Sequence, residues 1–278
     1  IPGGAARALA GEHDHAAVGR PGRAFVEERG GDLCPVVLQR FGAIWRIGAA
    51  VVPVNHMIGA DESSYIHQDC GGETLISSSD FLPRIEACRA NVPALRNVIL
   101  VGDSVPRGYH SYRQILDASP EETRIADVHD EDMAAIIYTA GTTGQPKGAM
   151  HTHRSLYFGG KMLHDSVPVP ENTVSLLVLP TCHVYGISCL IASSFHKKGK
   201  GIVLPSFTVD KIFEAIQTYR VNVFTGVPTL YVYMLLHPDP GKYDLSSMKY
   251  WISGSAALAP ETWHGGKERV GFASVEGG

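Results

Sequence analysis

One stretch of this chain constrains its fold more than any other: an apolar run, residues 133–137, is followed at once by a run rich in glycine and threonine. The apolar run, Met-Ala-Ala-Ile-Ile, has the length and composition of a buried strand. The run after it, residues 138–148, reads Tyr-Thr-Ala-Gly-Thr-Thr-Gly-Gln-Pro-Lys-Gly. Because glycine and proline are disfavoured inside helices and strands, this run predicts a loop at the end of a strand.

The composition of this loop indicates a site for phosphate groups. Glycine lets the main chain approach an anion closely, N–H groups and threonine hydroxyls donate to phosphate oxygens, and lysine adds a positive charge. The order differs from a Gly-x-x-x-x-Gly-Lys-Ser/Thr loop, since Lys147 follows Pro146 and precedes Gly148. The expected ligand is a nucleoside triphosphate, and the alternative is an ordinary surface turn. The residues expected to contact the ligand are Thr139, Ala140, Gly141, Thr142, Thr143, Gly144 and Lys147.

The run resembles the phosphate-loop motif of the adenylate-forming superfamily, which comprises acyl-CoA synthetases, aryl-CoA ligases, luciferases and the adenylation domains of peptide synthetases. That motif reads Tyr/Phe-Thr/Ser-Ser/Gly-Gly-Thr/Ser-Thr-Gly-x-Pro-Lys-Gly, and this chain departs from it at Ala140. The missing hydroxyl weakens the site by about 1 kcal/mol if that group contacts phosphate. The resemblance implies that ATP is bound together with Mg²⁺.

Further segments extend the resemblance over roughly residues 38 to 276. Residues 179–186, Leu-Pro-Thr-Cys-His-Val-Tyr-Gly, look like the family's Pro-x-x-His-x-x-Gly segment, which implies that His183 lies beside the acyl group and the α-phosphate. Residues 253–258, Ser-Gly-Ser-Ala-Ala-Leu, look like the Ser-Gly-Gly-Ala-Pro-Leu turn that lines the adenine. The adenine contacts implied are Gly254, Ser255 and Ala256, and the catalytic residues implied are Thr142, Thr143, Lys147 and His183.

Strand-like and helix-like runs alternate around these motifs. Apolar runs near 49–54, 74–77, 98–101, 133–138, 174–179, 202–204, 221–224 and 249–253 are typical of strands, and helix starts are expected at Asp61, Asp80, Arg154, Asp210, Pro228 and Pro260. Repeated strand-then-helix units predict an α/β fold with parallel-rich sheets flanked by helices. We expect a poorly specified segment over 1–31, a first α/β subdomain over 32–130, and a second over 131–278 that carries the phosphate loop.

Composition excludes several other classes of function. The net charge of -4 and the absence of long Lys/Arg blocks disfavour partners such as nucleic acid or anionic lipid. Five scattered cysteines suggest neither a disulfide framework nor a zinc site, which favours a cytoplasmic location. Residues 172–196 lack charge, but Pro180 and several polar residues interrupt them, so no integral membrane segment is expected. His151 and His153 are interpreted as residues at a helix entry, and no metal ligands are predicted.

The resemblance implies the chemistry of an acid–thiol ligase. Such an enzyme activates a carboxylic acid, here a fatty acid foremost, to an acyl-adenylate with ATP and then to a thioester with coenzyme A. The small-molecule carboxylate could contact apolar residues that serve equally well as core: Val184, Tyr185, Phe224, Val227 and Leu230.

The sequence stops at Gly278, where the family continues with Tyr-Gly-x-Thr-Glu, a ribose-binding Asp and a small domain with a catalytic Lys. We therefore expect an incomplete N-terminal large-domain portion, with little or no activity by itself. The alternatives are a catalytically incomplete nucleotide-binding remnant, an adenylation domain with another acceptor, and a luciferase-like oxygenase. The acceptor, the acyl chain length and the oligomeric state are left open.

Overall fold

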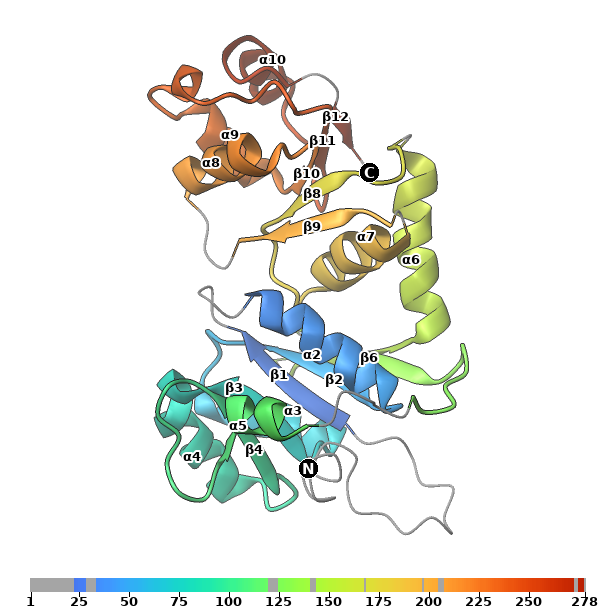
Figure 1. The fold of residues 1–278 in the computed structure, drawn as a ribbon, viewed down its shortest axis with the longest axis vertical. Helices are drawn as coiled ribbons and strands as arrows, with labels where there is room; N and C mark the ends of the chain where they lie inside the picture. Colours follow the sequence, from blue (N-terminus) through green and yellow to red (C-terminus); the bar gives the residue numbers. More distant parts are fainter. Residues whose placement is uncertain are drawn as a thin grey trace. The chain divides into compact units, whose positions relative to one another are not determined.

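The computed structural model of the chain describes residues 23–28, 34–119, 125–140, 144–167, 169–196, 198–204, 208–272 and 275–277. The chain divides into two compact units, residues 1–29 with 35–155 and residues 30–34 with 156–278. Each unit contains one sheet flanked by helices (Figure 1). The α/β class with parallel-rich sheets that the sequence predicts is therefore confirmed.

The first unit is built on a seven-stranded sheet with the order β5-β4-β3-β1-β2-β6-β7. Its strands are β1 (Arg23–Glu28), β2 (Ala50–Asn55), β3 (Thr74–Ser78), β4 (Asn97–Val101), β5 (His110–Ser111), β6 (Met133–Thr139) and β7 (Lys147–Thr152). All neighbours are parallel except β6 and β7, which are antiparallel. Strands β2, β4 and β6 are largely apolar along their length because helices cover a parallel sheet on its faces.

Helices of the first unit follow the strands in alternation. They are α2 (Cys34–Arg46), α3 (Ala60–Cys70), the 3₁₀ turn η1 (Ser79–Phe81), α4 (Leu82–Asn91) and α5 (Tyr112–Ala118). Helix α3 ends at Gly71, whose φ of 62° is left-handed and whose N–H donates to the carbonyl of His67. Glycine is favoured at this position because it adopts that conformation without steric cost. Ile66 of α3 and Ile85 of α4 pack with strand residues such as Val52 in one buried cluster.

The second unit contains a five-stranded, fully parallel sheet with the order β12-β11-β10-β8-β9. Its strands are β8 (Val174–Leu177), β9 (Lys200–Val203), β10 (Val223–Gly226), β11 (Tyr250–Ser253) and β12 (Val275–Gly277). The helical elements are α6 (His153–Ser166), whose first turn belongs to the first unit, the π-helix η2 (Tyr185–Ala192), α7 (Ser193–His196), α8 (Val209–Tyr219), α9 (Pro228–Leu235), η3 (Pro240–Lys242) and α10 (Pro260–Arg269). Aromatic rings fill its core, where Trp251 and Phe272 lie with centroids 4.8 Å apart.

The structure differs from the sequence prediction at three places. Within the segment 1–31, which is expected to be poorly specified, Arg23–Glu28 forms β1 between β2 and β3. After the phosphate loop, residues 147–152 form the strand β7, which the sequence does not predict, whereas α6 begins within one residue of the start expected at Arg154. The sequence also assigns strand 133–138 and the loop to a second subdomain starting at 131, whereas β6 and β7 complete the first sheet and that unit extends to Ser155. Strand β7 is mostly exposed at a sheet edge, so it lacks the apolar alternation that reveals a strand.

Candidate functional site

The phosphate loop connects two antiparallel strands. In the β6–β7 ladder Tyr138 is opposite Gly148, and Thr139 is opposite Lys147. The two strands therefore hold the threonine and the lysine at the base of the loop, one on each side. Of the other predicted loop residues, Ala140 and Gly144 are exposed, and Gly144 has a φ of +95°, which favours glycine. The predicted contacts Gly141, Thr142 and Thr143 lie outside the described residues.

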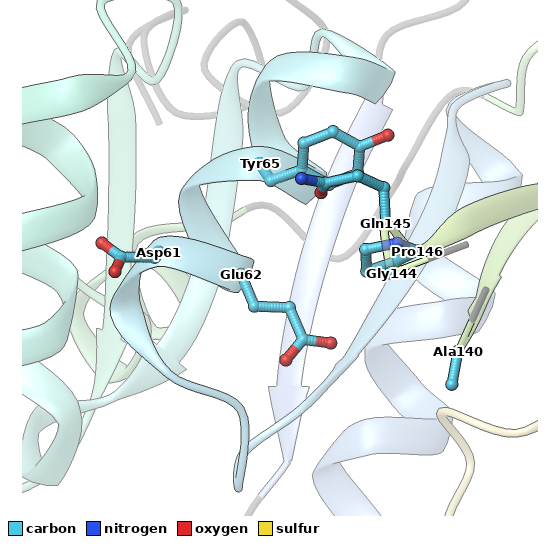
Figure 2. Close-up of a pocket in the computed structure, with 7 residues that line it drawn as sticks. All are labelled: Asp61, Glu62, Tyr65, Ala140, Gly144, Gln145 and Pro146. Carbon is cyan, nitrogen blue, oxygen red and sulfur yellow. The ribbon is translucent and has the colours of Figure 1, made fainter. Parts of the chain in front are cut away.

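A cavity of about 360 Å³ adjoins this loop within the first unit (Figure 2). Its lining comes from the first turns of α3 and from the loop: Asp61, Glu62, Tyr65, Ala140, Gly144, Gln145 and Pro146. Two carboxylates in this lining make the cavity electrostatically unfavourable for a polyphosphate. We therefore do not assign this cavity to the triphosphate.

The segment around His183 is a tight turn that fixes the imidazole. The His183 N–H donates to the Pro180 carbonyl at 3.3 Å, and the Tyr185 N–H donates to Nδ1 of His183 at 3.1 Å. Because Nδ1 accepts a hydrogen bond, the neutral ring carries its proton on Nε2. The side chain is exposed. It therefore presents an Nε2–H donor that suits an oxygen of a carboxylate or a phosphate.

Two adjacent glycines of α6 allow the close approach of the π-helix η2, which follows this turn. A Cβ on Gly159 of α6 would lie 2.1 Å from Oγ of Ser188, and one on Gly160 would lie 2.6 Å from the main-chain carbon of Ala192. Adjacent glycines weaken a helix interior, by about 1 kcal/mol each relative to alanine. Their presence in α6 is explained by the close approach of η2.

The turn after β11 meets the His183 segment inside the second unit. The Gly254 N–H donates to the Gly226 carbonyl at 3.1 Å, and a Cβ on Gly254 would lie 2.2 Å from Oη of Tyr185. Ser255 and Ala256 are exposed and small, which suits contact with a flat ring. Ser255 has a φ of 69°, a left-handed conformation that is uncommon for residues other than glycine.

The structure thus brings two of the three predicted motifs together. Tyr185, two residues from His183, touches the turn that contains Gly254, Ser255 and Ala256. The first unit contains Thr139, Ala140, Gly144 and Lys147, whereas the second unit contains His183, Tyr185 and the turn 254–256. Each half of the candidate site is therefore described within its own unit.

Three of the residues considered for an acyl pocket differ in their burial. Phe224 and Leu230 are almost fully buried in the core of the second unit, where Phe224 contacts the rings of Tyr231 and Trp251. These contacts favour the core interpretation for both residues. Val184, by contrast, is 37% exposed beside His183.

Other parts of the described chain show no additional centre of this kind. Burial lowers the pKa of His151 and of His153 below the usual value, although Asp132 and Asp130 partly oppose this for His153. In the described ranges, no three His, Cys, Asp or Glu side chains gather as metal ligands. None of the described helices has the length and apolar character needed to cross a membrane.

The fold and these motifs are those of an adenylate-forming enzyme, and comparison with known proteins shows the family. Residues 34–278 match the model of the AMP-binding enzyme family, and the chain belongs to that family. A long-chain-fatty-acid–CoA ligase of Mycobacterium tuberculosis is 29% identical over 216 residues, which cover 77% of this chain and 41% of that protein. The chain therefore spans less than half the length of this curated relative.

Two solved structures have the same fold. A crystal structure of an anthranilate CoA ligase in complex with anthranoyl-AMP has a TM-score of 0.85 and 25% identity, covering 94% of this chain and 51% of that one. ATP-bound MatB from Rhodopseudomonas palustris has a TM-score of 0.78 and 27% identity, covering 92% of this chain and 50% of that one.

Proposed function

We propose that this chain supplies the ATP-binding part of an enzyme that activates a carboxylic acid and transfers it to a thiol. In the first step a carboxylate oxygen attacks the α-phosphorus of ATP, and the bond to the β-phosphate oxygen breaks to release pyrophosphate. In the second step the thiolate of coenzyme A attacks the acyl carbon of the acyl-adenylate, and AMP leaves. The family membership and the ATP-bound relative of the same fold support this assignment.

The observation that carries the proposal is the pairing of Thr139 with Lys147 at the base of the loop. Negative charge builds up on the departing pyrophosphate, and a fixed ammonium group with nearby hydroxyl and N–H donors stabilises it. The proposed donors are those of Thr139, Gly141, Thr142, Thr143 and Lys147. Mg²⁺ enters as part of the Mg–ATP substrate, because this ion is usually bound through phosphate oxygens and water.

The second unit is proposed to bind the other parts of the substrates. We propose that the Nε2–H of His183 donates to an oxygen of the carboxylate or of the α-phosphate. The small residues 254–256 would contact the adenine. We propose a fatty acid as the carboxylate, on the basis of the mycobacterial relative, and an aromatic acid is the competing outcome, because the anthranilate ligase has the same fold.

The test of the proposal is carboxylate-dependent exchange between ATP and pyrophosphate, measured with a panel of fatty and aromatic acids. Exchange that needs an acid but not coenzyme A supports adenylation, and thioester formation after addition of coenzyme A supports the second step. ATP binding without exchange for any acid would instead support a nucleotide-binding remnant.

Lys147→Ala tests the loop itself. The substitution removes a charge-assisted contact of roughly 1.5–3 kcal/mol, so the Kd for ATP should rise about 10- to 100-fold in calorimetry. Lys249→Ala is the matched control, because Lys249 is also exposed but lies in the second unit just before β11. Equal ATP affinity of the wild type and Lys147→Ala would refute the proposed role of the loop.

A further inference from the structure

Tyr138 links the phosphate loop to a neighbouring helix. It lies on β6, one residue before the last ladder pair, and its hydroxyl donates a hydrogen bond of 2.5 Å to Oδ2 of Asp69 on α3. Such a short O–H···O distance is typical of a charge-assisted hydrogen bond. Burial, together with the hydrogen bond to Asp69 and the neighbouring Cys70, raises the pKa of Tyr138 well above its usual value. The hydroxyl therefore keeps its proton and remains a donor.

The position of Asp69 is unfavourable for the helix that carries it. Helix α3 ends at Cys70 and is capped by Gly71, so Asp69 lies in the last turn. The C-terminal end of a helix has partial negative charge, which disfavours a carboxylate there. Helix stability thus does not account for an acid at this place, whereas the hydrogen bond to Tyr138 does.

The hydroxyl end of the Tyr138 ring is also adjacent to Gly148. The two residues face each other across the ladder, and a Cβ on Gly148 would lie 3.0 Å from Cζ of Tyr138 and 2.8 Å from Cγ2 of Ile136. The ring therefore occupies the space that a side chain at position 148 would need. Lys147 precedes Gly148 directly, so the ring constrains the main chain next to the lysine.

We propose that Tyr138 is a positioning residue for the phosphate loop, which it holds through its hydrogen bond to Asp69 and its contact with Gly148. This deepens the proposed function and rests on it. Because Tyr138 contacts both α3 and β7, the Thr139–Lys147 pair keeps one orientation. Donors that are oriented before the ligand arrives bind a polyphosphate more tightly than donors that must be ordered on binding.

The test compares Tyr138→Phe, Asp69→Ala and the double variant in the full chain. Tyr138→Phe keeps the ring and removes only the donor. Tyr233→Phe is the matched control, because Tyr233 is 53% exposed on α9 in the second unit. The measurements are the Kd for ATP and for AMP by calorimetry, the amide exchange rates of Thr139, Lys147 and Gly148, and urea unfolding.

Each single variant should raise the Kd for ATP about fivefold. The double variant should bind ATP no more weakly than either single variant, because both changes remove the same hydrogen bond. The Kd for AMP should change less than about twofold, because AMP lacks the β- and γ-phosphates that the loop binds. Asp69→Asn keeps an acceptor and should restore part of the ATP affinity. Amide exchange should become faster at Thr139 and Lys147 in Tyr138→Phe but not in Tyr233→Phe.

Two results would overturn the proposal. One is an unchanged Kd for ATP together with unchanged amide exchange in Tyr138→Phe. The other is an equal loss of ATP and AMP affinity that follows a loss of unfolding free energy, since this would indicate a merely structural residue. If the wild type bound no ATP, the proposed function would fail on its own, and the exchange rates would still decide whether Tyr138 holds the ladder.

Discussion

Adding one methyl group at Gly186 should destabilise the second unit strongly. A Cβ there would lie 2.1 Å from the carbonyl oxygen of Pro180 and 2.8 Å from its carbon, whereas ordinary contacts begin at 3.4 Å. The obstacle is main chain, and its oxygen also accepts the N–H of His183. Because a displacement of more than an ångström is needed in a fixed turn, Gly186→Ala should lower the free energy of unfolding by about 2–3 kcal/mol.

Gly254→Ala meets a different kind of obstacle. Its Cβ would lie 2.2 Å from Oη and 2.6 Å from Cζ of Tyr185, the far end of a side chain that can rotate away. The expected loss of unfolding free energy is therefore only about 1 kcal/mol. Gly42→Ala provides the opposite case, because nothing lies within 4 Å of the added methyl group and alanine is favoured over glycine inside a helix such as α2. The free energy of unfolding should therefore rise by about 0.5–1 kcal/mol.

The assay is urea unfolding of the three variants and the wild type, followed by tryptophan fluorescence and circular dichroism. The expected order of stability is Gly42→Ala, wild type, Gly254→Ala and Gly186→Ala, from most to least stable. Equal midpoints for Gly186→Ala and Gly254→Ala would refute the reasoning, because they would show that the Pro180 carbonyl yields as easily as a tyrosine side chain.

Two further predictions concern single residues of the second unit. Ser255→Gly should raise the thermal midpoint slightly, because relief of the left-handed conformation, about 1–2 kcal/mol, exceeds the added entropy of the unfolded glycine, about 0.4–1 kcal/mol; a lowered midpoint would contradict this. Hydrogen bonds from Tyr243, then Lys242 and His237, lower the pKa of Asp210 to about 2. Because its pKa is lower in the folded state, Asp210 stabilises the fold at pH values above its pKa in the unfolded chain, about 4. This contribution is lost as the pH falls toward 2. Asp210→Asn should therefore flatten the pH dependence of the urea midpoint between pH 4 and 2, and identical profiles would rule the contribution out.

The sequence predicts those parts of the fold whose local pattern matches their environment. The buried strands β4 and β6 are found because strands covered by helices consist largely of continuous apolar runs. Strand β7 is missed because it is an exposed edge strand whose residues need not be apolar. Strand β1 is missed because the charged residues Arg23, Glu27 and Glu28 leave only a short apolar run in the middle of the strand.

The candidate site divides in the same way between local and long-range information. Lys147 and Thr139 are predicted from the sequence because the residue types in one short run indicate phosphate binding. The hydrogen bond between Tyr138 and Asp69 joins residues 69 positions apart, and no periodicity or composition indicates it. The contact of Tyr185 with Gly254 is equally distant in sequence, and only the glycine hints that something approaches closely.

The paired glycines of α6 have a consequence for which substitutions the chain tolerates. Gly159 faces a hydroxyl, the movable end of a side chain, whereas Gly160 faces the main chain of Ala192 and Ser193 at 2.6 and 2.7 Å. A larger residue at position 159 can therefore be accommodated if position 188 carries a smaller side chain. No substitution of a neighbouring side chain makes room at position 160. In a library of random variants, position 160 should stay glycine as strictly as a residue that touches substrate, although its constraint comes from packing alone.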